Sequence, residues 1–295
     1  MKPAMLFILL ISATAFADVK TLGNLASPML TETSGIAVSK RYPQLIWGIN
    51  DGGNPALLHA FSLDGSDQGS VAISRGPNFD WEDLASFVVD GTPYLLIADT
   101  GDNIGTRRTS WLLIVIEPQR GEDGLFAREV ELATRLPFQY EDGPRDCEAV
   151  AVDVASDRIL LVSKRDAVVY ELPLTLVKGV RRPLIAKKIA SIASLPRPTV
   201  GELLESPLLG LWRHQPTAID IADDGSFIAM MTYQHVYLFK HAVGQDWGES
   251  LRALPQVLSL PALSQTESVT FVEDRLIAVA EGRSAPIISI GPISH

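Results

Sequence analysis

The stretch FDWEDLASFVVDGTPYLLIADTGDN, residues 79–103, places three acids around a tryptophan and then continues into apolar segments. Two later stretches repeat this order, RDCEAVAVDVASDRILLVSKRD at 145–166 and QTESVTFVEDRLIAVAEGR at 265–283. In each of them an acid stands at the start of an apolar run, and a turn leads into a second apolar run. Short apolar runs separated by turn residues are typical of antiparallel strands. The recurrence indicates an internal repeat.

Five copies of the repeat can be aligned. They are TSGIAVS (33–39), WEDLASF (81–87), CEAVAVD (147–153), PTAIDIA (216–222) and TESVTFV (266–272). Their second residues are Ser34, Glu82, Glu148, Thr217 and Glu267, separated by 48, 66, 69 and 50 positions. Each copy is followed by two more apolar runs, and the first four copies have a fourth run. Four strands repeated at such a period predict a β-propeller.

We therefore expect an all-β chain that forms a β-propeller of five four-stranded blades. The fifth copy has no fourth strand before the C-terminus, but residues 18–25 (DVKTLGNL) offer one that would close the last blade and remove the open edge. Six blades are possible if the interval 172–216 contains a degenerate repeat. A β-sandwich is the competing fold, but it does not require one motif at a regular period. Only 199–212 is expected to be helical, with Thr199 and Glu202 spaced as a capping box.

The first seventeen residues are expected to be a signal peptide. They contain Lys2, an apolar run from Met5 to Ile11, and small residues that fit cleavage after Ala17. The apolar run is too short to span a bilayer, and no later segment reaches 18 uninterrupted apolar residues. We therefore expect a single propeller domain at 18–295, without a membrane span, located in a bacterial periplasm or secreted.

The chain carries a formal net charge of −10. This excess of acid argues against nucleic acid as a partner, because the phosphates would be repelled. Cys147 is the single cysteine, so an internal disulfide is excluded and packing must supply the stability. We expect Cys147 to be a buried, inert thiol and the protein to be a monomer.

The first strands of propeller blades line a central channel, so Glu82, Glu148 and Glu267 should meet there, with Ser34 and Thr217 at the remaining places. At a separation of ~6 Å and an effective dielectric of about 20, each carboxylate pair costs on the order of 2–3 kcal/mol. Protonation, an entering basic side chain or a bound cation would relieve this repulsion. Oxygen ligands without clustered His or Cys favour a hard cation, and Ca²⁺ is expected outside the cytoplasm. Alternatively, the glutamates accept backbone amides at strand starts and hold the blades together.

Polar loops should gather at the same face. The loop INDGGNP (49–55) contains Asn50 and Asp51 as candidate ligand-binding residues, while its two glycines are attributed to turn chemistry. The loop ADTGDNIGTRR (98–108) contributes Asp99 and Asp102, which are candidates for orienting a catalytic water, and Asn103, a candidate ligand-binding residue.

Two basic residues and a tryptophan complete the candidate set. Lys164 and Arg165 follow a buried strand, and they would either bind a phosphate or carboxylate or neutralise the acids of their own blade. Trp81 would either stack on a ligand or pack between blades.

The segments NDGGNPALLHAFSLDG, FDWEDLASF, IADTGDN, DGPRDCEAVAVD and LVSKRD together resemble a group of exported bacterial propeller proteins. That group carries an N-D-S-G-like loop, a D-W-E-D-[LI]-A strand, a D-I-G-D-N loop and a D-A-E-A-like strand, and the match spans residues 30–285. The chain departs from it at Cys147 and at the two glycines of the first loop, which leaves the acids unchanged. The resemblance implies a propeller with an acidic mouth. More remotely, the chain is similar in architecture to five-bladed calcium-dependent nucleotidases, in which acids from inner strands surround a central calcium.

Two functions follow from these observations. The first is a cation-dependent protein that binds or hydrolyses a small anionic ligand such as a phosphoester, with the ion as Lewis acid and template. The second is a non-catalytic module that presents one face to a protein, peptide or glycan. The sequence contains no G-x-S-x-G, H-E-x-x-H, G-x-x-x-x-G-K or C-x-x-C motif, so the chemistries of those motifs are set aside.

Overall fold

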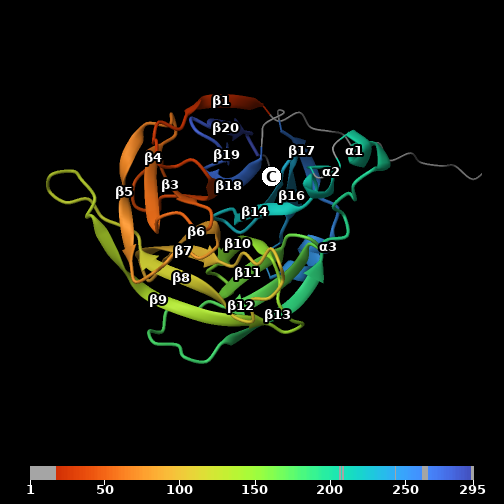
Figure 1. The fold of residues 1–295 in the computed structure, drawn as a ribbon, viewed down its shortest axis with the longest axis horizontal. Coiled ribbons are helices and arrows are strands. Elements are labelled where there is room, and N and C mark those ends of the chain that lie inside the picture. Colours follow the sequence, from red (N-terminus) through yellow and green to blue (C-terminus); the bar gives the residue numbers. More distant parts are fainter. Residues whose placement is uncertain (1–17, 206, 208, 243, 261–264, 294–295) are drawn as a thin grey trace, which may run out of the picture.

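The computed structural model describes residues 18–205, 207, 209–242, 244–260 and 265–293, so the expected signal peptide lies outside the described residues. The expected β-propeller is confirmed, because antiparallel four-stranded sheets are arranged around a common centre. Figure 1 shows β6, β10, β14 and β18 near that centre and β5, β9 and β13 at the rim. None of the described helices has the length and apolar character that crossing a membrane requires.

Strand pairing groups the described strands into five antiparallel sets of four, which we call blades one to five. Blade one contains β2 (Thr33–Val38), β3 (Leu45–Asn50), β4 (Leu57–Ser62) and β5 (Asp67–Ser74). Blade two contains β6 (Trp81–Val89), β7 (Thr92–Asp99), β8 (Ser110–Ile116) and β9 (Glu129–Tyr140). Blade three contains β10 (Cys147–Asp153), β11 (Arg158–Ser163), β12 (Val168–Pro173) and β13 (Leu184–Ser191). Blade four contains β14 (Pro216–Ile221), β15 (Phe227–Thr232), β16 (His235–Lys240) and β17 (Gln256–Ser259). Blade five contains β18 (Thr266–Val272), β19 (Arg275–Ala280), β20 (Pro286–Ile290) and β1 (Val19–Asn24).

The first and last described strands meet in blade five, as expected, because β1 pairs antiparallel with β20. The first strands contact one another in the order β2, β6, β10, β14, β18 and back to β2, which closes a ring. The described part of the interval 172–216 contains the end of β12, strand β13, and the helices α1 (Val200–Glu205) and α2 (Leu209–Trp212). It therefore holds no further four-stranded sheet among the residues that the structure describes.

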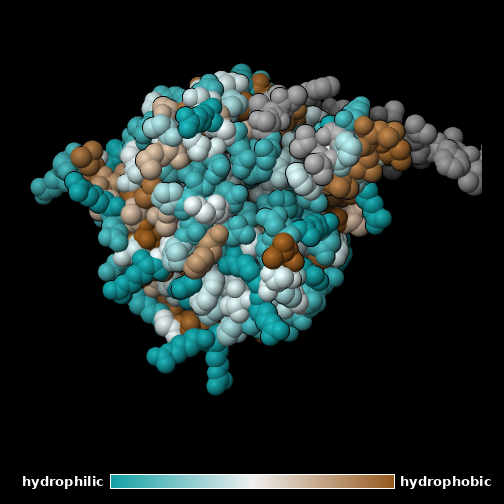
Figure 2. Space-filling view, viewed as in Figure 1, coloured by the Kyte–Doolittle hydropathy of each residue, from teal (hydrophilic) through white to brown (hydrophobic). Residues whose placement is uncertain are grey.

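The helices lie outside the ring of strands. Helix α1 begins at the expected capping box, in which the Glu202 amide donates to Thr199 Oγ1 at 3.2 Å and Glu202 Oε2 accepts the Thr199 amide at 2.8 Å. Figure 2 shows hydrophobic residues gathered over this region, where Val200 and Leu204 are exposed. The expectation that only 199–212 is helical is wrong, because a third helix, α3 (Trp247–Arg252), connects the last two strands of blade four.

Five hydrophobic clusters fill the five interfaces between neighbouring blades. Strand β7 shows why its apolar run is continuous. Leu95 and Ile97 pack toward blade one, whereas Leu96 and Ala98 pack toward blade three. Because both faces of each blade are buried, the inner strands do not alternate between apolar and polar residues.

The long outer strand β9 links three blades. Its first residues pair in parallel with β5 in blade one, and its last residues pair in parallel with β13 in blade three. This contact between outer strands supplements the apolar interfaces and protects three sheet edges.

Asp83 binds three blades together at the centre of the molecule. Its side chain is fully buried, and Oδ1 accepts the amide of Leu84 at 2.8 Å. Its Oδ2 accepts the amides of Val150 at 2.8 Å and Ile219 at 3.4 Å, which belong to blades three and four. The sequence offered Glu82 as a residue that could hold neighbouring blades together. In the structure its neighbour Asp83 does so.

Replacing Asp83 by alanine is expected to lower the free energy of unfolding by about 3 kcal/mol, because three buried amides would lose their acceptor. Denaturant unfolding measures the change. Glu131→Ala, which removes an exposed acid from β9, is the control and should change stability by less than about 0.5 kcal/mol. An Asp83→Ala protein as stable as this control would contradict the assigned role.

Candidate site at the axial mouth

Each inner strand carries a β-bulge at the same position. The strand register shifts between Thr33 and Gly35, Trp81 and Asp83, Cys147 and Ala149, Pro216 and Ala218, and Thr266 and Ser268. The extra residues are therefore Ser34, Glu82, Glu148, Thr217 and Glu267, the five residues aligned from the sequence. A bulge turns its extra side chain out of the regular alternation, so the repeat delivers one side chain per blade to the same end of the channel.

The two neutral members of this ring connect blades. Ser34 Oγ donates to the carbonyl of Trp81 at 3.1 Å, and Thr217 Oγ1 donates to the carbonyl of Thr266 at 3.2 Å. Both acceptors are the residues just before the bulge of the next blade. These hydroxyl groups fix the spacing around the ring and leave the glutamates as its charged part.

A second ring follows from the end of each second strand. The residue after β3, β7, β11, β15 and β19 is Asp51, Thr100, Lys164, Tyr233 and Glu281, respectively. The amides of four of them, Asp51, Thr100, Lys164 and Glu281, donate to the carbonyls of Glu32, Asp80, Asp146 and Gln265. These carbonyls belong to the residues two positions before the bulge. The mouth is therefore built from three matched positions per blade.

Two groups of three carboxylates have oxygens that all lie within 4.8 Å of one another. One contains Asp51, Asp80 and Glu82, and the other contains Glu82, Asp146 and Glu148. Glu82 belongs to both. Gly101 lies against this pair of groups, where a Cβ would overlap Glu82 Oε1 and the Asp80 carboxylate.

The structure thus brings together two of the three glutamates predicted to hold a metal. Glu267 belongs to neither group. Its carboxyl is instead within hydrogen-bonding reach of Glu281 and Tyr233, and two adjacent carboxyl groups can bond only by sharing a proton.

A basic side chain has also entered the mouth. Lys164 Nζ lies 2.7 Å from Glu148 Oε1, and both side chains are largely buried. This contact fits the expectation that Lys164 neutralises the acids of its own blade. One ammonium group cannot balance all the carboxylates around it.

Burial and mutual repulsion hold protons on these acids. Burial is the larger cause, and it raises the pKa of Glu148 to about 7 and that of Asp80 to about 6. Burial and then the neighbouring Glu281 raise the pKa of Glu267 to about 9. The pKa of Glu82 is raised well above its usual value by burial and then by Glu148. The mouth therefore carries less negative charge at neutral pH than its composition indicates.

The two residues predicted to orient a catalytic water have other contacts. Asp99 is buried, and its Oδ1 lies 2.8 Å from Arg107 Nη2. The two oxygens of Asp102 accept the amides of Thr106 at 2.8 Å and Arg107 at 2.7 Å. Both acids thus hold the loop that follows β7, and this geometry offers no support for their predicted role in catalysis.

The predicted ligand-binding residues separate in the structure. Asp51 lies in the first carboxylate group. Asn50 is buried, and its side-chain oxygen accepts the amides of Thr31 and Glu32 at 3.1 and 3.0 Å. Trp81 is fully buried in the cluster between blades one and two, so the expectation that a ligand stacks on it is corrected to packing between blades.

The remaining two predicted ligand-binding residues, Asn103 and Arg165, lie on the loops that follow β7 and β11. Asn103 is exposed, and its carbonyl accepts a hydrogen bond from Arg165 Nη2.

Cys147 is buried and free, as expected, and burial raises the pKa of its thiol to about 12.

Sequence reasoning missed Asp80, Asp146, Glu281 and Tyr233 as members of the site. A signal for them was present, because they occupy fixed offsets from the bulge or from the end of the second strand. These offsets could be recognised only after the pairing of the first and second strands of each blade was known. Gly52 was attributed to turn chemistry, but its φ is ordinary and a Cβ there would meet the Asp80 carboxylate.

No protein-family model matches the chain, and no curated protein matches it. The resemblance to exported bacterial propeller proteins therefore remains an expectation from the motifs. The chain is similar to a solved luciferin-regenerating enzyme (10% identity, 93% of this chain and 95% of that chain, TM-score 0.47). It is also similar to a PQQ-bound aldose sugar dehydrogenase from Streptomyces coelicolor (11%, 93% and 98%, 0.48) and to a nidogen/laminin complex (9%, 85% and 73%, 0.43). The strand pairing and the site define a β-propeller with an acidic axial mouth.

Without added cation, the protein should become less stable as the pH rises from about 5 to about 9. The native acids keep protons that the unfolded chain has already lost, and stability falls with pH wherever the native state binds more protons. The pKa values near 6, 7 and 9 set this window. Melting curves at graded pH in chelator test it, and Glu82→Gln should flatten the slope. A stability that rises across the window would contradict the assignment.

Proposed function

We propose that the axial mouth binds a divalent cation, expected to be Ca²⁺, and that the ion recruits a small anionic ligand such as a phosphoester. The observation that carries this proposal is the convergence of two three-carboxylate groups on Glu82. Hard cations prefer carboxylate oxygens, and a bound ion would offset the burial and the mutual repulsion that raise the pKa values of Glu82 and Glu148. Calcium also suits the export expected from residues 1–17.

The residues present fit such an ion. Asp146 Oδ2 is buried but has no hydrogen-bond partner, while Oδ1 of the same group accepts the Asp102 amide at 2.9 Å. Arg165 Nη2 lies 3.8 Å away, within ion-pair range but too far for a hydrogen bond, so this buried oxygen still lacks a donor, which is costly. Gly101 and Gly52 allow the backbone to approach Asp80 and Glu82 closely. Together these features leave oxygen atoms available that a cation would satisfy.

Ligand binding is better supported than hydrolysis. Hydrolysis would require a group that orients water, and the two candidates, Asp99 and Asp102, are bound to the following loop. The same observation favours the second function, a non-catalytic module that binds a protein, peptide or glycan. A screen of phosphoester substrates with calcium and with chelator separates the two. Cation-dependent turnover supports an enzyme, and its absence together with retained cation binding supports a binding module.

Glu82→Gln is expected to weaken calcium binding at least about 100-fold, because Glu82 is shared by both carboxylate groups and a buried charge-assisted contact is worth about 3 kcal/mol. Isothermal titration calorimetry and elemental analysis measure the change. Glu131→Gln, on the outer strand β9, is the matched control and should bind as the unaltered protein does. Equal calcium affinity in Glu82→Gln would reject the site.

Gly101→Ala should also weaken calcium binding, by about tenfold or more, because the added methyl group would displace the carboxylates of Glu82 and Asp80. The φ of Gly101 is one that alanine adopts, so any fall of the melting temperature in chelator should reflect the displaced carboxylates and not backbone strain. Gly201→Ala in α1, where a Cβ makes only an ordinary contact, is the control. A loss of stability without a loss of calcium affinity would show that Gly101 serves folding only.

A further inference from the structure

A cavity of about 270 Å³ opens between blades two and three beside the carboxylate groups. Its walls come from the loop after β7, the connection between β9 and β10, and the turn after β11. The residues that matter here are Asp102, Pro144, Arg145, Asp146, Arg165 and Asp166. Asp146 also belongs to the group with Glu82 and Glu148. The cavity and the candidate cation site therefore share a wall.

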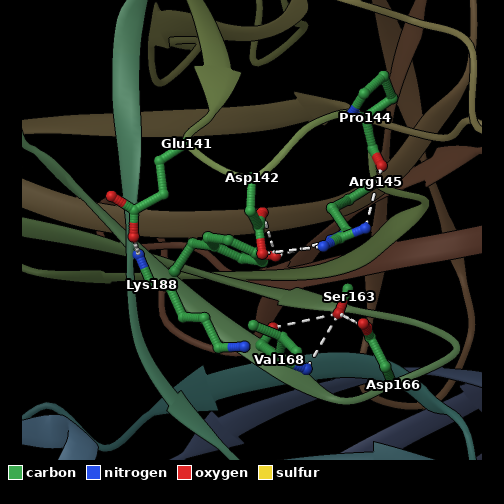
Figure 3. Close-up of polar contacts among 9 residues, drawn as sticks. Glu141, Asp142, Pro144, Arg145, Ser163, Asp166, Val168 and Lys188 are labelled. Atoms are coloured by element: carbon green, nitrogen blue, oxygen red, sulfur yellow. Dashed lines mark hydrogen bonds and ion pairs between the residues drawn. The ribbon is translucent and has the colours of Figure 1, made fainter.

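Arg145 is held in a defined orientation at this cavity. Its Nε donates to Tyr170 Oη at 2.7 Å, and its Nη2 lies 2.8 Å from Asp142 Oδ2 (Figure 3). Tyr170 Oη in turn donates to Asp142 Oδ1 at 2.9 Å. The contact of Arg145 Nη1 with the carbonyl of Pro144 is 3.5 Å, which is long for a hydrogen bond. One end of this oriented guanidinium therefore keeps donor capacity for a ligand.

Arg165 supplies a second guanidinium. It follows Lys164 on the turn after β11, it is exposed, and its Nη2 donates to the carbonyl of Asn103 on the loop of blade two. The same Nη2 lies 3.8 Å from Asp146 Oδ2. A guanidinium has five donors in a planar fork that matches the oxygens of a phosphate. Two such groups on one small cavity are an arrangement suited to an anion.

The acids of the walls determine when an anion can bind. The oxygens of Asp102 accept loop amides, and Asp166 accepts the hydroxyl of Ser163; Figure 3 shows the latter pair below Arg145. Asp146 Oδ2 has no hydrogen-bond partner. Without a cation these carboxylates repel an anion. With a cation at Asp146, the anion meets positive charge at this wall as well as at the two arginines.

We propose that this cavity binds the phosphate group of a small phosphate monoester, between Arg145, Arg165 and the cation held at Asp146. This rests on the proposed cation site and adds the position and chemical class of the ligand. The volume lies just below that of usual ligand pockets, which begin at roughly 300 Å³, so the organic part of the ligand is small. Cation and phosphate promote each other's binding, because such coupling is reciprocal.

Calorimetric titrations of inorganic phosphate and of glycerol phosphate, each in calcium and in chelator, test the proposal. Both compounds should bind with calcium and lose measurable binding in chelator. Arg165→Gln and Arg145→Gln should each weaken phosphate binding by about tenfold or more, the effect of losing a charge-assisted hydrogen bond. Arg108→Gln changes an exposed arginine of the neighbouring loop and should leave the affinity within about twofold.

The outcomes separate the two proposals. The phosphate site is overturned, and the cation site stands, if the protein binds calcium but no phosphate. The same conclusion follows if Arg165→Gln binds phosphate with unchanged affinity. No calcium binding overturns the cation site, and phosphate bound equally well in chelator overturns the coupling. Because Arg145 also contacts Tyr170 and Asp142, its replacement can weaken folding. The exposed Arg165 therefore decides the test, with melting temperature as the control.

Discussion

The bulge in each inner strand is the constraint on which the rest of the mouth depends. In a regular strand, residues three apart face opposite sides. Yet Trp81 and Leu84 both pack in the interface with blade one, and Cys147 and Val150 both pack in the interface with blade two. The extra residue of the bulge shifts the alternation of side chains by one position. The residues on either side of the bulge therefore face the same interface, and the extra side chain lies outside it. Glu82 and Glu148 can be polar because they occupy this one position per blade that neither apolar interface can use.

The sequence was informative wherever the repeat was visible. The five aligned copies predicted the propeller, the closure by residues 18–25 and the convergence of Glu82 with Glu148, because position in a repeat translates directly into position around an axis. The contacts of each individual side chain could not be predicted from the sequence. Asp99 ends β7 and Asp102 lies in the polar loop that follows, but only the structure shows that Arg107 and two loop amides contact them. Trp81 looks available in sequence but is buried in the cluster between blades one and two.

The adjacent acids Glu82 and Asp83 have different roles in this chain. Asp83 accepts three amides from blades two, three and four, so both of its carboxylate oxygens have partners in the protein. Glu82 stands one residue earlier, among other carboxylates, and is the common member of both three-carboxylate groups. Satisfied buried acids stabilise a fold, whereas acids grouped with their own kind weaken it unless something else binds. The motif of three acids around Trp81 is therefore a structural residue next to a site residue, and composition alone cannot distinguish them.

The sequence left three ways to relieve the repulsion in the ring, and the structure contains two of them together. Lys164 pairs with Glu148, and burial together with the neighbouring Glu281 raises the pKa of Glu267 to about 9, which favours a retained proton there at neutral pH. Both measures are partial, since neither provides a partner for Asp146 Oδ2. A cation would compete with both: it would displace protons from the glutamates and weaken the hold of Glu148 on Lys164. The ammonium released in this way would face the same mouth as the two arginines. If the proposed cation binds, the mouth would thus change from a region that repels anions to one that attracts them.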